Sequence, residues 1–586
     1  MPIQLSERQQ AIVDCASERI VVKACPGSGK TFSVAARMAR LLKENGLSKH
    51  QGIAAISFTN TACEVIKHEL RNTFNCDNIS YPSFIGTIDS FINTYIFLPY
   101  AHLVMQCDER PEIVGTEYNK WYDYDSSIRN FDRTKITDPN YYFDKVSFDL
   151  HNNLLRLAPY QAYHFGKTDW ENPKKQDGSL KKVISDLIEM KKRHFKLGKA
   201  NQSDANYIAY CVLRKYPSIA ATLVERFPIF IIDEAQDTTE LQMAIINIFD
   251  QVGAKSIMLI GDPDQAIFEW NTANPTLFID KYNDPRWASL DLSENRRSSE
   301  KICCWANRFW NNAMTSVSEQ DRDYPEEPQL LNHKDTAGSI NQITEQFIEK
   351  CKSLGLNETQ YAVVYRGRNF GAKFFGLIDN DTSQAASPWK HGHYYVRDIV
   401  QGKFLIDCGQ YKRGLALIEM GLYKMSLGVR YVPTSAIKKQ IQQEGFRDYR
   451  ARIVDFIQQL PSTDKLLTEW IVEAQTKKIN LLVETRNAAI NIGNLFREND
   501  QAKQDRPYLR TMHSVKGMSL EAILVFLRKK SGTKNYVTLL NGLAHNNAQD
   551  NEELRVVYVA CTRPKKILWL AVPEEDVERW RQFLVE

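Results

Sequence analysis

Eight consecutive residues near the amino terminus could hold a nucleotide phosphate: Ala24-Cys25-Pro26-Gly27-Ser28-Gly29-Lys30-Thr31. They follow an apolar run, 19–23, that predicts a strand, and precede a stretch, 32–42, whose apolar spacing predicts a helix. A loop of small residues in this position can turn its backbone N–H groups toward phosphate oxygens. Lys30 would reach the β- and γ-phosphates, and the Thr31 hydroxyl would help hold magnesium. The full pattern begins with glycine, where this chain has Ala24.

Two adjacent acids follow a second apolar run. Residues 228–232 predict a buried strand that leads directly into Asp233 and Glu234. A carboxylate at the tip of a strand beside a phosphate loop can hold magnesium, and the next carboxylate can orient the attacking water. Two acids at a strand end would by themselves be typical of a turn. The phosphate loop favours the functional interpretation, with Asp233 at the metal and Glu234 in catalysis.

A third predicted strand, 256–260, ends in a segment with further candidate residues. Gln265 could sense the γ-phosphate of a bound nucleotide. Phe268 and Trp270, two residues apart, could stack on unpaired bases, and each stacked base would contribute about 1–3 kcal/mol. Both aromatic residues could instead belong to the core.

Two other residues also have a functional and a structural interpretation. Gln9 lies in a predicted helix that Ser6 caps, just before the phosphate loop, and could bond the edge of an adenine or face solvent. Phe58 ends the predicted strand 53–58 and could stack on a base or lie in the core.

Length and composition limit the class of protein. A chain of 586 residues predicts more than one domain. The formal net charge is only +4, so a nucleic-acid surface would have to be local. The 11 cysteines show no zinc-ligand spacing, which predicts free thiols in a reducing compartment. With no long apolar run and no signal-peptide pattern, we expect a cytoplasmic protein without a membrane partner.

The pattern of elements changes along the chain. Residues 1–96 and 221–297 predict one α/β region, and residues 298–380 and 506–586 predict another, with no further domain expected after it. Two insertions, 97–220 and 381–505, predict mostly helix, including stretches at 449–460 and 466–496. Lysines 181 and 182 and residues 191–194 form a basic cluster around the amphipathic helix 183–190. This cluster predicts either contacts with phosphates or a solvated helix face.

Eight segments, taken together and in order, resemble the motifs of the UvrD/Rep/PcrA-like helicases of superfamily 1. Gln9 matches the family's adenine-reading glutamine, and residues 233–237 match its DEAQD motif. The other six segments resemble TFTNKA, GTFHS, GDxxQSIYxW, LxxNYRS, TxHxxKG and EExRLxYVAxTR, and lie at 57–62, 86–90, 261–270, 292–298, 511–517 and 552–563. The resemblance covers nearly the whole chain.

The resemblance implies two RecA-like parallel-sheet domains, each with a mostly helical insertion, that bind ATP and Mg²⁺ between them. It places ATP on Gln9, Pro26, Gly27, Ser28, Gly29, Lys30, Thr31 and Arg296, and the metal on Thr31 and Asp233. It assigns catalysis to Glu234, Gln265, Arg297 and Arg563, the two arginines neutralising charge on the transferred phosphoryl group. It assigns DNA binding to Phe58, Thr59, Asn60, Thr87, Phe268, Trp270 and His513.

This chain departs from the family's pattern at several positions. Arg296 replaces a tyrosine that stacks on adenine, and a guanidinium can also stack, so the selectivity for the nucleotide base stays open. Asp89 replaces a histidine and Phe268 a tyrosine. Ser519 replaces a glutamate and Asn271 an arginine, two changes that could weaken coupling to DNA.

Two functions are compatible with these observations. The first is an ATP-dependent DNA translocase or helicase that moves 3′ to 5′ on single strands and unwinds duplexes with a 3′ tail, as in DNA repair. The alternative is an ATP-hydrolysing regulatory protein that senses nucleic acid and activates a partner nuclease in antiviral defence. The compact build resembles the helicase-like subunits of bacterial anti-phage systems of the Gabija kind.

Overall fold

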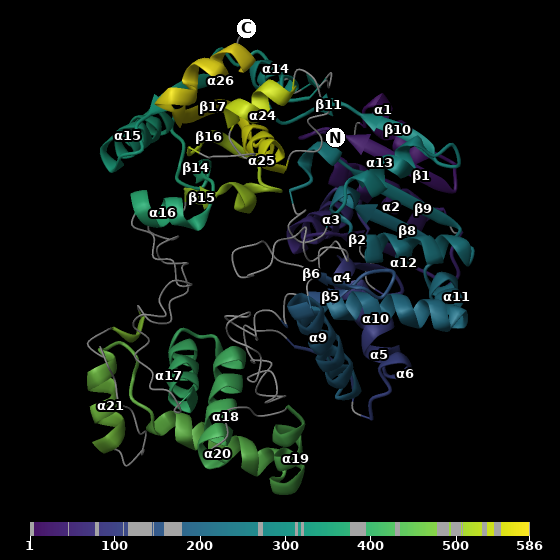
Figure 1. Ribbon diagram of the computed structural model, residues 1–586, viewed down its shortest axis with the longest axis vertical. Coiled ribbons are helices and arrows are strands. Elements are labelled where there is room, and N and C mark those ends of the chain that lie inside the picture. The colour runs from purple at the N-terminus through teal and green to yellow at the C-terminus, as the bar shows by residue number, and fades with distance from the viewer. Residues whose placement is uncertain are drawn as a thin grey trace. The chain divides into compact units, whose positions relative to one another are not determined.

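The computed structural model describes most of the chain (Figure 1). The described residues are 5–44, 46–76, 81–108, 110–114, 143, 146–156, 178–267, 273–310, 314–317, 322–375, 394–427, 434–476, 491–493, 506, 508–529, 536–543 and 552–584. They include two parallel sheets with helices, which confirms the predicted α/β class with two parallel-sheet regions.

Among the described residues the first sheet has six parallel strands in the order β10-β1-β9-β8-β2-β3. These are β1 (Arg19–Ala24), β2 (Ile53–Ser57), β3 (Phe84–Thr87), β8 (Ile229–Asp233), β9 (Ser256–Gly261) and β10 (Ala288–Leu292). Because all six are parallel, their carboxyl ends meet at one edge of the sheet. Ligands bind at this edge in open α/β sheets.

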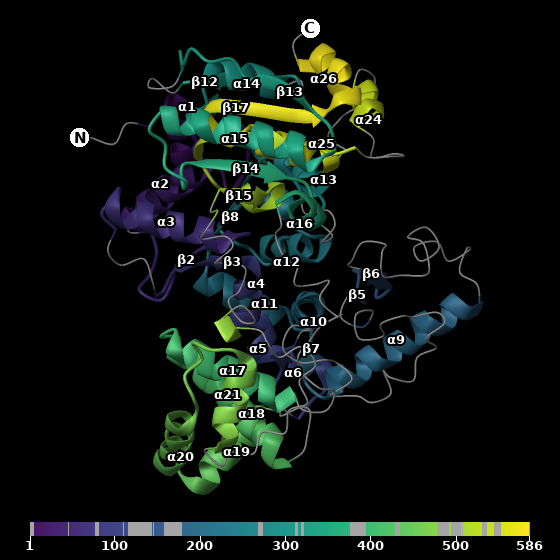
Figure 2. The ribbon, with the colours of Figure 1, turned by 90° about the vertical axis from the view of Figure 1, so that its left-hand side faces the viewer.

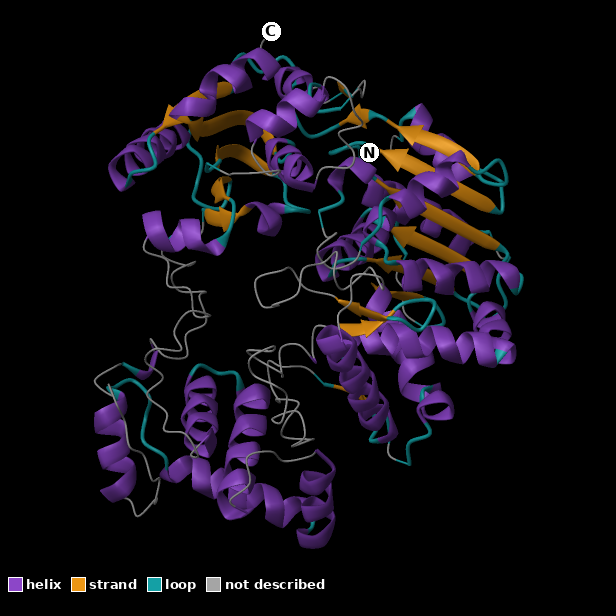
Figure 3. Ribbon diagram, viewed as in Figure 1, coloured by secondary structure: helices purple, strands orange, loops and turns teal. Residues whose placement is uncertain are grey.

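Two apolar layers cover the first sheet, one on each face, and alternate strand residues point to opposite layers. Val22 and Ile231 join the layer with helices α1 and α2, while Val21 and Ile232 join the layer with α10 and α12. The helices of this part are α1 (Glu7–Asp14), α2 (Lys30–Lys43), α3 (Asn60–Asn72), α4 (Ile88–Ile92), α10 (Gln202–Lys215), α11 (Pro217–Arg226), α12 (Glu240–Gln251) and α13 (Thr276–Asn283). Figure 3 shows these helices (purple) around the strands (orange).

Strand β3 is not among the strands predicted from the sequence. The structure forms a strand over Phe84–Thr87, and α4 begins at the next residue. The strand is short and half-buried throughout, so it lacks an apolar run. Gly86 leaves room for the Phe84 ring, because a Cβ at Gly86 would lie 2.5 Å from the Cζ atom of that ring.

The second sheet has five parallel strands in the order β13-β17-β16-β14-β15, counted over the described residues. They are β13 (Gln329–His333), β14 (Tyr361–Tyr365), β15 (Leu509–Thr511), β16 (Leu520–Phe526) and β17 (Pro564–Pro573), the long arrow of Figure 2. Its helices are α14 (Glu300–Asn307), α15 (Ala337–Ser353), α16 (Arg368–Phe375), α24 (Tyr536–Leu543), α25 (Glu552–Cys561) and α26 (Val577–Leu584). Helix α25 is buried along its length, which fixes the residues at both of its ends.

The region between α4 and α10 was predicted to be mostly helical, but its described residues also form four short strands. They are β4 (Glu112–Ile113), β5 (Val146–Phe148), β6 (Leu154–Arg156) and β7 (Lys199–Ala200). Its helical segments are α5 (Leu98–Tyr100), α6 (His102–Met105), the 19-residue α9 (Gly178–Lys196) and the π-helix η1 (Asn93–Phe97). Strands of two or three residues leave too short a pattern for sequence to reveal.

Part of the predicted basic cluster is buried, so both interpretations offered for it are wrong at Lys191 and His194. Lys191 is fully buried, and its Nζ donates to Asp204 Oδ2 at 2.6 Å. His194 is also buried, beside the ring of Phe143. Lys192 and Arg193 are exposed. The apolar face of α9 therefore includes two residues that composition alone assigns to solvent.

A second compact unit contains the described residues between 371 and 507. It has helices α17 (Tyr394–Asp407), α18 (Tyr411–Leu427), α19 (Thr434–Glu444), α20 (Phe446–Gln459) and α21 (Leu467–Thr476). Two glycines let α17 and α18 approach closely, because a Cβ on Gly414 would lie 2.6 Å from the carbonyl oxygen of Gly402. The buried Trp470 donates from Nε1 to the Pro461 carbonyl at 3.0 Å.

The predicted continuous helix over 466–496 is wrong. Helix α21 ends at Thr476, and Leu466 forms an antiparallel backbone bridge with Asn491. A continuous helix would separate these two residues by about 38 Å, which the bridge excludes. Among the helices that the structure describes, none has the length and hydropathy to cross a membrane.

Candidate nucleotide site

The phosphate loop joins β1 to α2 at the carboxyl edge of the first sheet. Gly27 and Gly29 have φ angles of 70° and 80°, in the left-handed region that favours glycine. Gly29 is the N-cap of α2, so no side chain of the cap residue occupies the first amides of the helix. The Ser28 hydroxyl donates to the Cys25 carbonyl at 2.7 Å and closes the loop. The loop has the geometry of an anion site.

Thr31 and Asp233 lie together, as their proposed metal role requires. The Thr31 Oγ1 hydroxyl donates to Asp233 Oδ2 at 3.1 Å. Burial, together with the charge of Glu234, raises the pKa of Asp233 to about 7. A hydroxyl and a carboxylate are oxygen donors suited to Mg²⁺, which usually takes its remaining ligands from water and phosphate. The described residues contain no group of three or more His, Cys, Asp or Glu side chains that could hold a metal ion by themselves.

Glu234 is held in an unusual backbone conformation beside this pair. Its φ of 55° is left-handed, and Gln236 Nε2 donates to its Oε2 at 2.6 Å. Burial raises the pKa of Glu234, but the charges of Lys30 and Lys516 outweigh this and hold it at about 2. The carboxylate is therefore ionised at neutral pH and can accept a hydrogen bond from water.

Two of the four predicted catalytic residues meet across the two sheets. Gln265 Nε2 donates to Asp262 Oδ2 at 2.5 Å, and Gln265 Oε1 accepts from Arg563 Nη2 at 2.5 Å. Arg563 follows α25 of the second sheet and is buried. Arg297 donates from Nη1 to the Thr562 carbonyl at 3.1 Å, and burial with the nearby charge of Arg563 lowers the pKa of Arg297 to about 9.

The two residues predicted to contact the adenine base take different positions. Gln9 is buried, and its Nε2 lies 3.5 Å from the Ser28 carbonyl, at the phosphate loop. Arg296 is exposed, and its backbone N–H donates to the Gly27 carbonyl at 2.9 Å. Its guanidinium lies 3.4 Å from Glu294.

One residue of this site was not singled out from the sequence. Asn295 is fully buried, and its Oδ1 accepts from the backbone N–H groups of Arg297 and Ser298. A Cβ at Gly27 would lie 2.7 Å from that oxygen. Asn295 thus holds the arginine segment against the phosphate loop. Its place in the LxxNYRS-like segment was the available signal.

Four predicted DNA-binding residues lie where β2 and β3 end, at the same sheet edge. Phe58 and Thr59 are half-buried and Asn60 is exposed. Thr87, which pairs with Ser57 across the two strands, caps α4 through its hydroxyl. Phe268 and Trp270 lie outside the described residues.

His513 lies within a charged network of the second sheet. Arg366 Nη1 lies 3.0 Å from His513 Nδ1, and the same guanidinium forms two hydrogen bonds, 2.8 and 3.2 Å, with Glu553. His513 also hydrogen-bonds with the backbone of Ile267. Arg366 and Glu553 were not assigned a role from the sequence, because their partners are distant in the chain.

The environment of His513 predicts a pH effect on stability. Burial and the charge of Arg366 lower its pKa to about 4, so between that value and about 6.5 the unfolded chain binds a proton that the folded chain does not. The folded state therefore loses stability relative to the unfolded state as the pH falls from about 6.5 toward 4. Because glutamine does not titrate, we expect the urea midpoint of the wild type to fall relative to that of His513→Gln between pH 7 and pH 5. A constant difference between the two midpoints would contradict this assignment.

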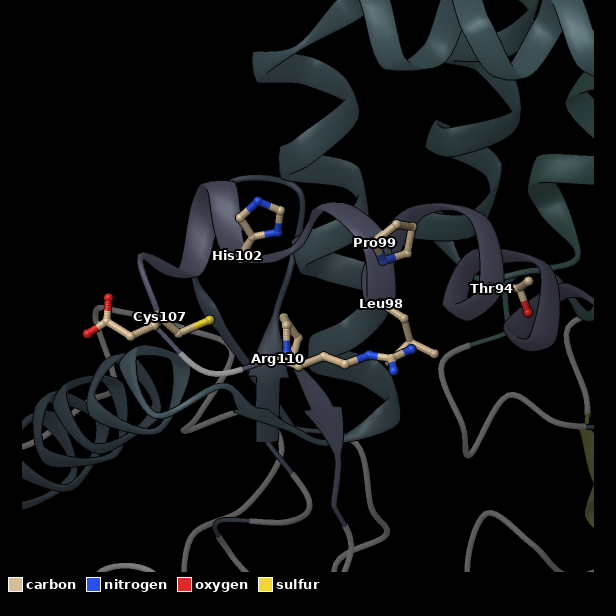
Figure 4. Close-up of a pocket in the computed structure, with 8 residues that line it drawn as sticks. Thr94, Leu98, Pro99, His102, Cys107 and Arg110 are labelled. Atoms are coloured by element: carbon tan, nitrogen blue, oxygen red, sulfur yellow. The ribbon is translucent and has the colours of Figure 1, made fainter. Parts of the chain in front are cut away.

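A separate pocket of about 610 Å³ lies near η1, α5 and α6 (Figure 4). It is lined by Thr94, Leu98, Pro99, His102, Cys107, Asp108, Arg110 and Pro111. None of the predicted nucleotide or DNA residues is among these.

Comparisons with known proteins agree with the motifs. Residues 5–286 match the family described as the UvrD/REP helicase N-terminal domain. The chain is 21% identical to a probable DNA helicase II homolog of Mycoplasma pneumoniae, over 97% of this chain and 84% of the relative. It is 22% identical to the Gabija protein GajB of Bacillus cereus (strain VD045), over 99% of this chain and 97% of the relative.

A higher identity covers a smaller region. The chain is 30% identical to one component of an ATP-dependent helicase/nuclease of Staphylococcus epidermidis, over 30% of this chain and 14% of that protein. The ordered motifs, the two parallel sheets and the matches lead to one conclusion. Over residues 5–286 the chain belongs to the UvrD/REP helicases, and beyond them it is similar to these proteins at low identity.

Proposed function

We propose that this protein is an ATP-driven translocase that moves 3′ to 5′ on single-stranded DNA and unwinds duplexes with a 3′ tail. The observation that carries the proposal is the contact of Arg563 with Gln265, which joins the two sheets beside Asp233 and Glu234. A site built from both halves makes hydrolysis depend on how the halves are placed, and this dependence is what a motor requires.

Each residue has a role in the proposed reaction. The backbone N–H groups of the phosphate loop and Lys30 bind the phosphates, and Glu234 accepts a hydrogen bond from the attacking water. Gln265 contacts the γ-phosphate, and Arg297 and Arg563 stabilise the charge that develops there. Gln9 and Arg296 would contact the base. Thr31 and Asp233 would hold Mg²⁺, which when bound supplies further charge neutralisation.

We also propose a division of the chain into two domains, each with an insertion. The first RecA-like domain would comprise 1–96 and 221–297 and the second 298–380 and 506–586, with insertions at 97–220 and 381–505. Helices α10 and α11 contribute apolar residues to the same core as β8 and β9. Although this division assigns α10 to the first insertion, limited proteolysis should therefore leave both helices attached to the first domain.

The single strand is proposed to lie along the carboxyl edges of the sheets, on Phe58, Thr59, Asn60, Thr87, Phe268, Trp270 and His513. Replacing Trp270 tests this surface. We expect Trp270→Ala to keep ATP hydrolysis without DNA near the wild-type rate and to lose most of the stimulation by DNA, because one stacked base contributes about 1–3 kcal/mol. Trp287→Ala removes a buried aromatic side chain of the same domain, and so measures the effect of lost packing alone on the stimulation by DNA. Unchanged stimulation in Trp270→Ala would place this residue in the core.

A second candidate function is favoured by the near-full-length match to the Gabija protein GajB. In this alternative the ATP cycle senses nucleic acid and activates a partner nuclease in antiviral defence, whereas the first function belongs to DNA repair. Both alternatives use the same ATP site.

The deciding experiment measures ATP hydrolysis by the pure protein with and without single-stranded DNA, and strand separation on duplexes with 3′ or 5′ tails. Stimulation by DNA with unwinding of the 3′-tailed duplex supports the translocase. Hydrolysis that ignores DNA, or unwinding that requires a copurifying protein, supports the regulatory role. Unwinding of the 5′-tailed duplex alone would contradict the proposed direction.

A further inference from the structure

A buried hydroxyl at the carboxyl end of β2 has no role in the proposed reaction or on the proposed DNA surface. Ser57 is the last residue of this strand and is only 1% exposed. Its Oγ atom has no hydrogen-bond partner among the residues that the structure describes. Buried hydroxyls without a partner are uncommon in folded proteins, and an additional water or ion is a frequent explanation. The Ser57 hydroxyl is therefore a candidate contact for a group outside the protein chain.

The strand register brings Ser57 beside Asp233. Strands β2 and β8 are parallel, and Ile56 of the first lies opposite Ile232 of the second. The next pair along the two strands is Ser57 and Asp233. Neighbouring strands lie about 4.7–4.9 Å apart, and residues that pair across them direct their side chains to the same face of the sheet.

The face that these two residues share is the one that α2 covers. Ala55 and Ile231, two positions earlier on each strand, both belong to the apolar layer with α1 and α2. Because strand side chains alternate between the two faces, Ser57 and Asp233 point to the same layer. Helix α2 carries Thr31, whose hydroxyl donates to Asp233 Oδ2 at 3.1 Å. All three side chains therefore lie on one face at one end of the sheet, around the proposed magnesium site.

Helix α3 lies against the same two strand ends. The buried Cys63 of this helix forms a hydrogen bond with the backbone of Ser57. Burial, with a further contribution from the charge of Asp233, raises the pKa of the Cys63 thiol to about 11. Cys63 is therefore close to both residues, in agreement with the strand register.

Mg²⁺ supplies the kind of partner that this hydroxyl lacks. The cation requires an octahedral set of oxygen ligands and usually keeps several waters among them. Groups that hydrogen-bond to the ligands of a metal orient those ligands and raise the metal affinity. We propose that Ser57 is a positioning residue of the magnesium site, whose hydroxyl bonds a water of the cation and raises the affinity for Mg²⁺ beside bound nucleotide. This inference rests on the proposed function, which assigns the metal to Thr31 and Asp233.

The experiment titrates Mg²⁺ into the protein bound to a fluorescent, non-hydrolysable ATP analogue. The protein is in excess, so the analogue is bound before the metal is added, and the change in fluorescence gives the Kd of Mg²⁺. We expect Ser57→Ala to raise this Kd by about 10- to 100-fold, the range typical of groups that support metal ligands. The affinity for the analogue in EDTA should stay near the wild-type value, because the phosphate loop is unchanged.

Stability separates this role from a structural one. Without nucleotide and metal, the Ser57 hydroxyl is buried without a partner, so its removal should leave the urea midpoint at least as high as that of the wild type. Ser57→Thr keeps a hydroxyl and should bind Mg²⁺ more tightly than Ser57→Ala. A lower urea midpoint together with weaker analogue binding in EDTA would assign Ser57 to the fold alone and overturn the inference.

Two further variants define the outcome. Thr344→Val removes a buried hydroxyl from α15, beside the second sheet, and should leave the Kd of Mg²⁺ unchanged. Asp233→Asn removes the proposed metal-binding carboxylate and should weaken Mg²⁺ binding. If Asp233→Asn weakens Mg²⁺ binding and Ser57→Ala does not, only the inference is overturned. If neither variant changes the Kd of Mg²⁺, the metal site of the proposed function is wrong, and the inference falls with it.

Discussion

Glu234→Gln is expected to bind ATP as tightly as the wild type and to lose hydrolysis by at least about 100-fold, because a positioned general base typically contributes 10²- to 10⁴-fold. The glutamine keeps the size of the side chain and its contact with Gln236, but it cannot accept a proton from water. Phosphate release measures the turnover, and a fluorescent ATP analogue measures the binding.

The pKa of Glu234, which is about 2, adds a pH condition to this prediction. Because Glu234 stays ionised across the working range, the loss in Glu234→Gln should be the same at pH 6 and at pH 8. Glu240→Gln, at an exposed position at the start of α12, is the matched control and should hydrolyse ATP normally. Turnover of Glu234→Gln above about one tenth of the wild-type rate would assign the base to another group.

Arg563→Ala is expected to reduce ATP hydrolysis by about 10³- to 10⁵-fold, the range that an arginine finger contributes. The guanidinium reaches Gln265 from the other sheet, so its removal takes away both the charge and the contact between the halves. The affinity for ATP should fall far less, because the phosphate loop lies entirely in the first sheet region. Single-turnover phosphate release separates the two effects.

The controls for Arg563 address stability and geometry. Arg581→Ala removes an arginine from an exposed position of α26 and should leave both hydrolysis and the unfolding midpoint unchanged. Arg563→Lys keeps the charge but loses the planar fork, and should remain strongly impaired. If Arg563→Ala unfolds at the wild-type temperature and still hydrolyses ATP at more than about one tenth of the normal rate, Arg563 is not the finger.

The phosphate loop and the acidic pair illustrate what sequence alone can predict. Gly27, Gly29 and Lys30 belong to a local structure, a strand, a turn and a helix, whose backbone geometry is set within about twenty residues. Residues 228–232 are uninterrupted apolar residues, so β8 and the position of Asp233 at its end could also be predicted. The contact of Thr31 with Asp233 then follows from parallel strands that end at one edge.

Elements without a strong local pattern were predicted less well. Strand β3 is half-buried at every position, so neither an apolar run nor alternation marks it. Lys191 and His194 are buried because Asp204 and Phe143, which are distant in sequence, supply an ion pair and an aromatic surface. The pairing of Leu466 with Asn491 likewise depends on contacts that no helical window contains.

By itself the sequence determined the phosphate loop, the acidic strand end, the α/β class and the resemblance to one helicase family, because each depends on short segments with a fixed spacing. Only the tertiary structure decided that Arg563 meets Gln265 and that Lys516 and Arg555 hold the carbonyls of residues 265 and 266. These partners lie about 250 to 300 residues apart in the chain. Charged side chains at such separations meet only when two sheets have folded and packed, and no local rule selects which pairs will form.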